Sequence, residues 1–210
     1  MEVILKGFSS SLHYLEGCTS VSLPSAMNSL QLLHCYLEQP IELSHHILTK
    51  LVELRICECN MSQPTLERMI KILETSQAKK LRTLDLQGNG LSDGPEECRV
   101  LASLFQNTSL AELSLEDNPI GNEGILAMFC SPSKQPSYAR LDRLNLRSTH
   151  LAAKGIEAIA KSAVCSNLRA LNISENRLDA LAVETLADLT SLEDLEMESI
   201  IGGLDDRAFA

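Results

Sequence analysis

The residues of this chain whose types could carry chemistry are its cysteines and histidines. Cys57 and Cys59 flank Glu58, a grouping that could begin a metal site. A structural zinc site needs a second pair of ligands at short spacing, and the sequence offers none. His45 and His46 are adjacent, so on a helix they would not share a face. We therefore expect these histidines at the surface or in a loop, and no metal site.

The sequence also lacks the motifs that build most catalytic sites. It contains no G-x-x-x-x-G-K-[ST], no G-x-G-x-x-G, no H-E-x-x-H and no G-x-S-x-G. A catalytic pairing of a cysteine with a histidine stays open, but no spacing favours it. We expect a protein that is not an enzyme and that uses no cofactor.

Composition and charge exclude several classes of protein. The 210 residues are 44% hydrophobic and 22% charged, as in a globular domain, and the net charge is −10. This charge argues against direct binding to nucleic acid, which needs a basic face, and permits basic partners. The apolar run in the start MEVILKGFSSS is too short for the core of a signal peptide. No apolar run in the sequence approaches the length of a transmembrane helix.

The cysteines point to the compartment. There are seven, an odd number, scattered without a C-x-x-C pair. A disulfide framework is therefore not expected, and a reducing intracellular compartment, cytoplasmic or nuclear, is predicted.

A sequence repeat predicts the strands and helices of this chain. The segment LRTLDLQGNGL at 81–91 has leucine at its first, fourth, sixth and eleventh places and asparagine at its ninth. The pattern starts again at 51, 110, 141, 168 and 192, although the last copy keeps only its first three apolar places. A period near 29 residues over so many copies indicates a repeat architecture.

These copies resemble leucine-rich repeats of the long, ribonuclease-inhibitor-like class. The resemblance implies an α/β solenoid, a curved right-handed horseshoe with a parallel concave sheet and convex helices. We expect repeats over 51–202, irregular repeats or a cap over 1–50, and a C-terminal tail over 203–210. Because unrelated proteins use this fold as a binding scaffold, the resemblance says little about function.

The second half of each copy has the period of an amphipathic helix. Apolar residues recur at helical spacing at Leu66, Met69, Ile70 and Leu73, and again at Ile156, Ile159, Ala160 and Ala163. Asp93 followed by Pro95 predicts a capped helix start. Gly124 and Gly155 stand just before their predicted helices, where a missing Cβ allows close approach; Pro95 and Ala182 replace them in other copies.

The ninth place faces inward where the chain leaves the strand. The backbone N–H and C=O groups there no longer make hydrogen bonds within the sheet. Burying them without another hydrogen-bond partner would cost free energy of folding. Asn89, Asn118 and Asn176 carry a donor and an acceptor that can satisfy them. Thr149 and Cys59 are weaker substitutes in the other copies.

The ends and one insertion are irregular. The segment 29–39 fits either a helix or a degenerate repeat strand. The insertion at 130–141 contains two prolines and is predicted to be an exposed loop. The tail reads as a frayed end or a terminal cap.

Residues between the leucines face away from the core, because alternate side chains of a strand point to opposite sides. At the second, third, fifth, seventh and eighth places stand the acids Glu53, Glu58, Asp85, Glu112, Glu116, Asp117, Asp142, Glu175, Glu193, Asp194, Glu196 and Glu198. The same places hold Arg55, Arg82, Arg143, Arg147 and Arg169, and no lysine. Most of the net negative charge therefore lies on one face.

Two interpretations of this face stay open: a solvated surface that keeps the protein soluble, or a groove that binds a basic protein segment. The absence of lysine favours the groove, since arginine is the residue suited to planar, bidentate contacts. The predicted partner-binding residues are Arg82, Asp85, Glu112, Glu116, Asp117, Arg143, Asn145, Arg147, Arg169, Asn172, Glu175, Glu196 and Glu198.

The leading functional hypothesis is thus a non-enzymatic interaction domain of an adaptor, scaffold or sensor, binding a protein partner on an acidic concave face. The alternative is a regulator of a small GTPase, because GTPase-activating proteins share this repeat class. Arg55 and Arg82 are the arginines proposed for that role, although no flanking motif identifies either.

Overall fold

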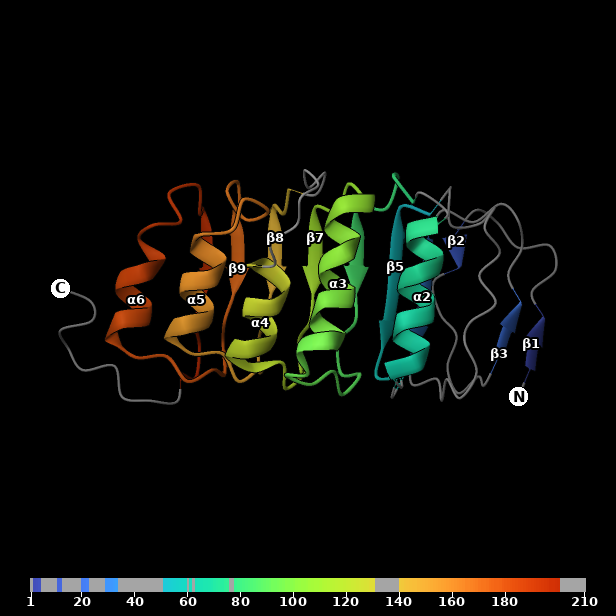
Figure 1. The fold of residues 1–210 in the computed structure, drawn as a ribbon, viewed down its shortest axis with the longest axis horizontal. Coiled ribbons are helices and arrows are strands. Elements are labelled where there is room, and N and C mark those ends of the chain that lie inside the picture. Colours follow the sequence, from blue (N-terminus) through green and yellow to red (C-terminus); the bar gives the residue numbers. More distant parts are fainter. Residues whose placement is uncertain are drawn as a thin grey trace.

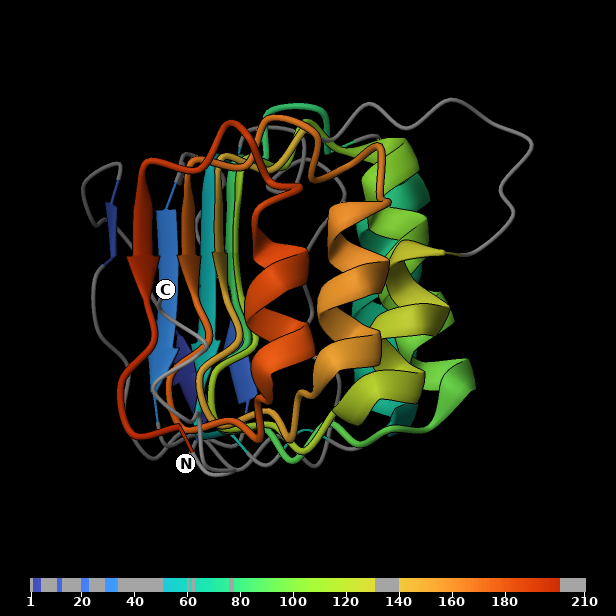
Figure 2. The same ribbon diagram turned by 90° about the vertical axis from the view of Figure 1, so that its left-hand side faces the viewer.

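The chain stacks strand–loop–helix units side by side, with the strands on one side and the helices on the other (Figures 1 and 2). This computed structural model describes residues 2–4, 11–12, 20–22, 29–33, 51–59, 61, 63–75, 78–130 and 140–200, with backbone alone for 2–33 and 95–97. The histidine pair, the body of the insertion at 131–139 and the tail from 201 onward lie outside the described residues.

The elements alternate along the chain from residue 53 onward. The strands are β1 (Glu2–Ile4), β2 (Ser11–Leu12), β3 (Ser20–Ser22), β4 (Ser29–Leu33), β5 (Glu53–Cys57), β6 (Thr83–Asp85), β7 (Glu112–Ser114), β8 (Arg143–Asn145), β9 (Ala170–Asn172) and β10 (Asp194–Glu196). The helices are α2 (Gln63–Thr75), α3 (Pro95–Asn107), α4 (Gly121–Phe129), α5 (Ala153–Ala160) and α6 (Ala180–Leu186).

Eight of these strands form one parallel sheet in the order β10-β9-β8-β7-β6-β5-β4-β2, and β1 pairs with β3 separately. The fourth-place leucines are register partners across the sheet, from Leu54 to Leu84 and on to Leu195. Parallel strands need a crossover connection, and each helix supplies one. At 29–33 the chain is a strand paired with β5, so the helical alternative is wrong there.

The core lies between the sheet and the helices. First-, fourth- and sixth-place side chains are almost fully buried from Leu51 to Ile173, and each buried leucine contributes about 1.5–3 kcal/mol. In the last strand Leu195 is 41% exposed. The predicted helical face of α2 is confirmed, since Leu66, Met69, Ile70 and Leu73 are buried.

The helix starts differ from the prediction in detail. Asp93 does not cap α3: Gly94 is the N-cap and makes no side-chain capping bond, so the proline start supplies the preset φ instead. Gly124 and Gly155 lie inside the first turns of their helices, not before them. A Cβ on Gly155 would stand 2.3 Å from Leu151 Cδ1, so the expected close approach is present.

The end of α5 also differs from the prediction. The helix stops at Ala160, which is half-buried, and Ala163 beyond it is exposed. Ala158 is buried in the helix instead. The start of α5 is held from the neighbouring unit, because Asn122 Oδ1 accepts bonds from the backbone N–H groups of residues 152 and 155.

The ninth-place side chains form a ladder of hydrogen bonds between units. Asn118 Oδ1 accepts from the N–H groups of Asn89 and Leu91, both at 3.0 Å. Its amide donates to the carbonyls of Leu86 and Leu115 at 2.9 and 3.0 Å. Asn89 and Asn176 make the same bonds from their own units. Each accepts from a backbone N–H group of the preceding unit and donates to a carbonyl of that unit.

The substitutes in the ladder do less, as expected. Thr149 Oγ1 reaches only the carbonyl of Leu146 and the amide oxygen of Asn176, at 2.7 and 3.4 Å. Cys59 Sγ reaches the carbonyl of Cys57 at 3.1 Å. Neither carries an amide that both accepts from the preceding unit and donates to it.

We expect Asn118→Ala to lower the free energy of unfolding by about 1–3 kcal/mol, because the buried N–H groups of Asn89 and Leu91 lose the side-chain acceptor that they share. Urea denaturation of the purified chain measures this loss. The control is Asn107→Ala, at the half-buried end of α3, where the side chain donates a single bond to the carbonyl of Ser103. Equal effects of the two changes would contradict the ladder's role.

Candidate functional site

The sheet face is the surface formed by second-, third-, fifth-, seventh- and eighth-place residues of β5–β10, turned away from the helices. Every predicted partner-binding residue lies on it and is exposed or half-buried. Its central part contains a hollow of about 220 Å³, which is lined by residues of β5–β10. A second hollow of about 390 Å³ adjoins it near the starts of β7–β10.

One arginine joins three units at the exit of the strands. Arg147 contacts Glu116 at 3.4 Å and Glu175 at 2.5 Å, from β7 and β9 units on either side. The amide of Asn145 donates to Glu116 at 2.8 Å, and its oxygen accepts from the backbone N–H of Arg147 at 3.1 Å. The predicted residues Glu116, Asn145, Arg147 and Glu175 are therefore brought together.

The other predicted residues form smaller groups. Arg143 lies 3.8 Å from Glu112, in a loose exposed pair. Asn172 donates to Glu196 at 2.7 Å. Asp117 accepts from Gln87 at 3.3 Å.

The remaining arginines of the face are also engaged within the chain. Arg55 contacts Glu53 at 2.5 Å and Asp85 at 3.7 Å. Arg169 contacts Glu193 at 3.4 Å, and Arg82 donates to the carbonyl of Ser109 at 3.2 Å. Exposed pairs of this kind contribute about 0–1 kcal/mol each, so they can exchange with a ligand.

Three carboxylates of the sheet face have no side-chain partner among the described residues. Within the part of the chain that the structure describes, Asp142, Asp194 and Glu198 accept no side-chain hydrogen bond and form no ion pair. All three are exposed. The described carboxylates of the sheet face that have no side-chain partner therefore lie toward β8–β10.

The eighth-place residues have a left-handed backbone conformation that the sequence did not predict. This conformation is present in every unit, with φ of 53° at Glu58, 54° at Asp117, 55° at Ser148 and 56° at Glu175. Only Gly88, with φ 64°, is of the type that favours this region. Its N–H still bonds to the next unit, as from Asp117 to the carbonyl of residue 147 at 3.1 Å. This turn fixes where the acids at the strand exits stand.

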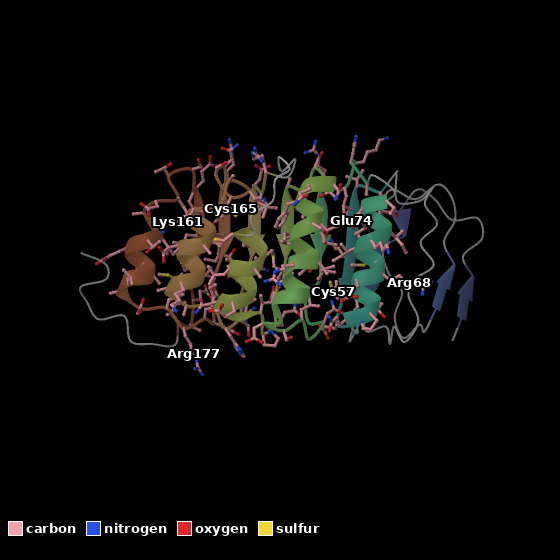
Figure 3. All side chains as sticks on the ribbon, viewed as in Figure 1. Cys57, Arg68, Glu74, Lys161, Cys165 and Arg177 are labelled. Carbon is pink, nitrogen blue, oxygen red and sulfur yellow. The ribbon has the colours of Figure 1, made fainter. Side chains whose placement is uncertain are left out.

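Cys57 occupies the seventh place of its copy, where the repeat predicts a surface residue, and that prediction is wrong. Its side chain is only 5% exposed, since β5 runs on to this residue and its register partner is Leu33 of β4. Burial, assisted by the neighbouring Asp85, raises the pKa of the Cys57 thiol to about 12. Figure 3 labels this thiol and that of Cys165, whose pKa burial also raises to about 12. Across the described residues, no group of three or more potential ligands could hold a metal.

The small residues of the hollow were missed from the sequence. Thr83, Ser114 and Ala170 line it, yet the predicted partner-binding residues are all charged or amide side chains. Their small size at the third and fifth places is visible in the sequence and could have located the hollow. None of the described helices is long and apolar enough to cross a membrane.

The architecture and its ladder define a solenoid of short strand–loop–helix repeats. A family model for leucine-rich repeats matches residues 77–94, 106–129 and 164–187. The mouse (Mus musculus) ribonuclease inhibitor is 32% identical over 127 residues, which are 57% of this chain and 27% of that protein. The chain therefore has the leucine-rich repeat fold, and its repeats are similar to those of the ribonuclease inhibitor.

Two further relatives share the repeat region. The Rho GTPase-activating protein gacW of Dictyostelium discoideum is 30% identical over 114 residues, 47% of this chain and 10% of that protein. The human (Homo sapiens) NACHT, LRR and PYD domains-containing protein 5 is 26% identical over 181 residues, 70% of this chain and 15% of that protein. The chain thus spans between a tenth and about a quarter of the length of these relatives.

We expect iodoacetamide at pH 8 to modify the exposed Cys130 of the native protein and to spare Cys57 and Cys165. The thiols of Cys57 and Cys165 are buried and burial raises the pKa of each to about 12, so at pH 8 they present almost no reactive thiolate to the reagent. Peptide-resolved mass spectrometry measures the labelling, and unfolding in guanidinium should expose all three. Equal native labelling of Cys57 and Cys130 would contradict the buried position.

Proposed function

We propose that this domain binds a protein partner through a basic segment that lies on the sheet face. Leucine-rich repeat domains are generally protein-interaction modules, and they bind on the extended face that stacking creates. The observation that carries the proposal is the set of unpaired carboxylates Asp142, Asp194 and Glu198, of which the first two line a hollow in the sheet face.

The balance of charge supports a basic partner over an acidic one. Four arginines of the face are already paired with this chain's own carboxylates, so little positive charge is left for an acidic ligand. Carboxylates outnumber arginines on the face, which would steer a basic segment toward it. The domain would act by binding, without catalysis, in an intracellular adaptor, scaffold or sensor.

The structure suggests which residues should be changed to test this proposal. Glu116 holds Asn145 and Arg147, so reversing its charge would disturb the face itself. Asp142, Asp194 and Glu198 can be reversed without breaking a described bond. We expect this triple change to lysine to weaken the binding of fluorescein-labelled octalysine at least tenfold, measured by fluorescence anisotropy at low salt.

The matched control reverses three exposed acids on the helical side, Glu123, Glu184 and Asp188. It changes the net charge by the same amount, so it separates binding at the sheet face from general attraction to an acidic protein. The melting temperature of both variants should stay close to that of the wild type. Octalysine affinities that fall equally in the two variants would sink the proposal.

The alternative, a GTPase regulator, is favoured by one observation, the similarity to a Rho GTPase-activating protein. That similarity covers 10% of the relative. Arg55 contacts Glu53 and Asp85, and Arg82 donates to the carbonyl of Ser109, so neither arginine is held ready by a contact specific to a GTPase. We expect no acceleration of GTP hydrolysis across a panel of small GTPases; a tenfold acceleration of any of them would reverse this preference.

A further inference from the structure

The third-place residues form one row across the sheet face. Register pairs link Glu53 to Thr83, Thr83 to Glu112, Glu112 to Arg143, Arg143 to Ala170 and Ala170 to Asp194. Neighbouring strands are about 4.8 Å apart, so each side chain of the row adjoins the next. Ala170 is the smallest of the row, and it leaves a gap between Arg143 and Asp194.

The two hollows of the sheet face share this gap. Glu112, Arg143, Ala170 and Asp194 line both of them. Ala170 itself is half-buried, because the taller neighbours on both sides screen it. The gap therefore connects the central hollow to the edge of the sheet face where the strands begin, and a side chain could enter it from that edge.

The floor beside the gap is fixed before any ligand arrives. Asn145 is held by Glu116 and by the backbone N–H of Arg147. Asn172 is held by Glu196 and by the backbone N–H of Ser174, at 2.7 and 3.0 Å. A fixed floor reduces the entropy lost when a ligand is bound.

Unpaired negative charge flanks the gap. Asp194 is the register partner of Ala170, and the backbone N–H of Ala170 donates to the carbonyl of Asp142 at 2.9 Å. Both side chains line the hollow near the strand starts. Beyond Arg143 in the row stands Glu112, whose contact with Arg143 at 3.8 Å is exposed and loose.

We propose that the gap over Ala170 receives one arginine side chain of the bound basic segment, as its anchor. This inference rests on the proposed function and names the residue that its partner must present. A guanidinium is planar and carries five donors, so it can serve Asp142 on one side and Asp194 on the other. A lysine ammonium is a compact point charge and cannot satisfy two flanking carboxylates in the same way.

The experiment compares fluorescein-labelled octa-arginine with octalysine, which carry equal charge, by fluorescence anisotropy. We expect the wild-type chain to bind octa-arginine at least fivefold more tightly than octalysine. Ala170→Leu fills the gap without changing the charge, and Asp194→Asn removes one flanking charge without changing the shape. Each should reduce the ratio of the two affinities to below twofold.

Ala163→Leu is the matched control, because Ala163 is exposed after α5 and lies outside both hollows. It should keep the full preference for octa-arginine, and melting temperatures should show that all variants fold. Equal binding of both peptides to the wild type, or a preference that survives Ala170→Leu and Asp194→Asn, would overturn the anchor and leave the proposed function standing. If neither peptide binds the wild type, both proposals fall.

Discussion

The structure depends on one recurring interaction, the hydrogen bonds that a ninth-place amide makes with the backbone of the unit before it. Short strands of three residues satisfy few backbone groups by themselves, and the loops that follow would leave the rest unpaired inside the core. Asn89, Asn118 and Asn176 supply hydrogen bonds to these backbone groups from one unit to the next. With that ladder in place, the leucines can stack as one continuous core and the sheet face stays in register.

The sheet face follows from the same constraint. Because each unit is fixed to its neighbour, third- and fifth-place residues of six strands stand in straight rows, and their chemistry adds up across the sheet. In most of the face, acids and arginines from adjacent units neutralise one another, as around Arg147. Toward β8–β10 this pairing is incomplete, and Ala170 leaves room there.

The sequence predicts much of this fold because a repeat presents the same evidence several times. The leucine places, the helical face of α2 and the role of the asparagines were all visible in the spacing. Helix starts were visible only in part: Pro95 begins α3 as its position predicts, but the N-cap is Gly94 and not Asp93. The left-handed eighth place was hidden as well, because Glu58, Asp117 and Glu175 occupy it where glycine would have marked it.

The face was predicted by its charges but not by its shape. Spacing located the acids and arginines on one side, yet it could not say which of them would pair, because pairing depends on side chains reaching across from adjacent strands. The burial of Cys57 was missed for a similar reason: β5 runs two residues further than most of its neighbours. A hollow depends on which side chains are neighbours in the folded chain. The small size of Ala170 therefore became informative only once Arg143 and Asp194 were found to be its register partners.

The ladder has a direction, and it bears on how the chain acquires its structure. The amide of Asn118 completes the loop around Leu86 and Leu91, and that of Asn176 completes the loop around Thr149 and Leu151. Each unit is therefore finished by the one that follows it in the sequence. A chain leaving the ribosome from its N-terminus must hold every unit incomplete until the next has emerged, so its folding lags one repeat behind its synthesis.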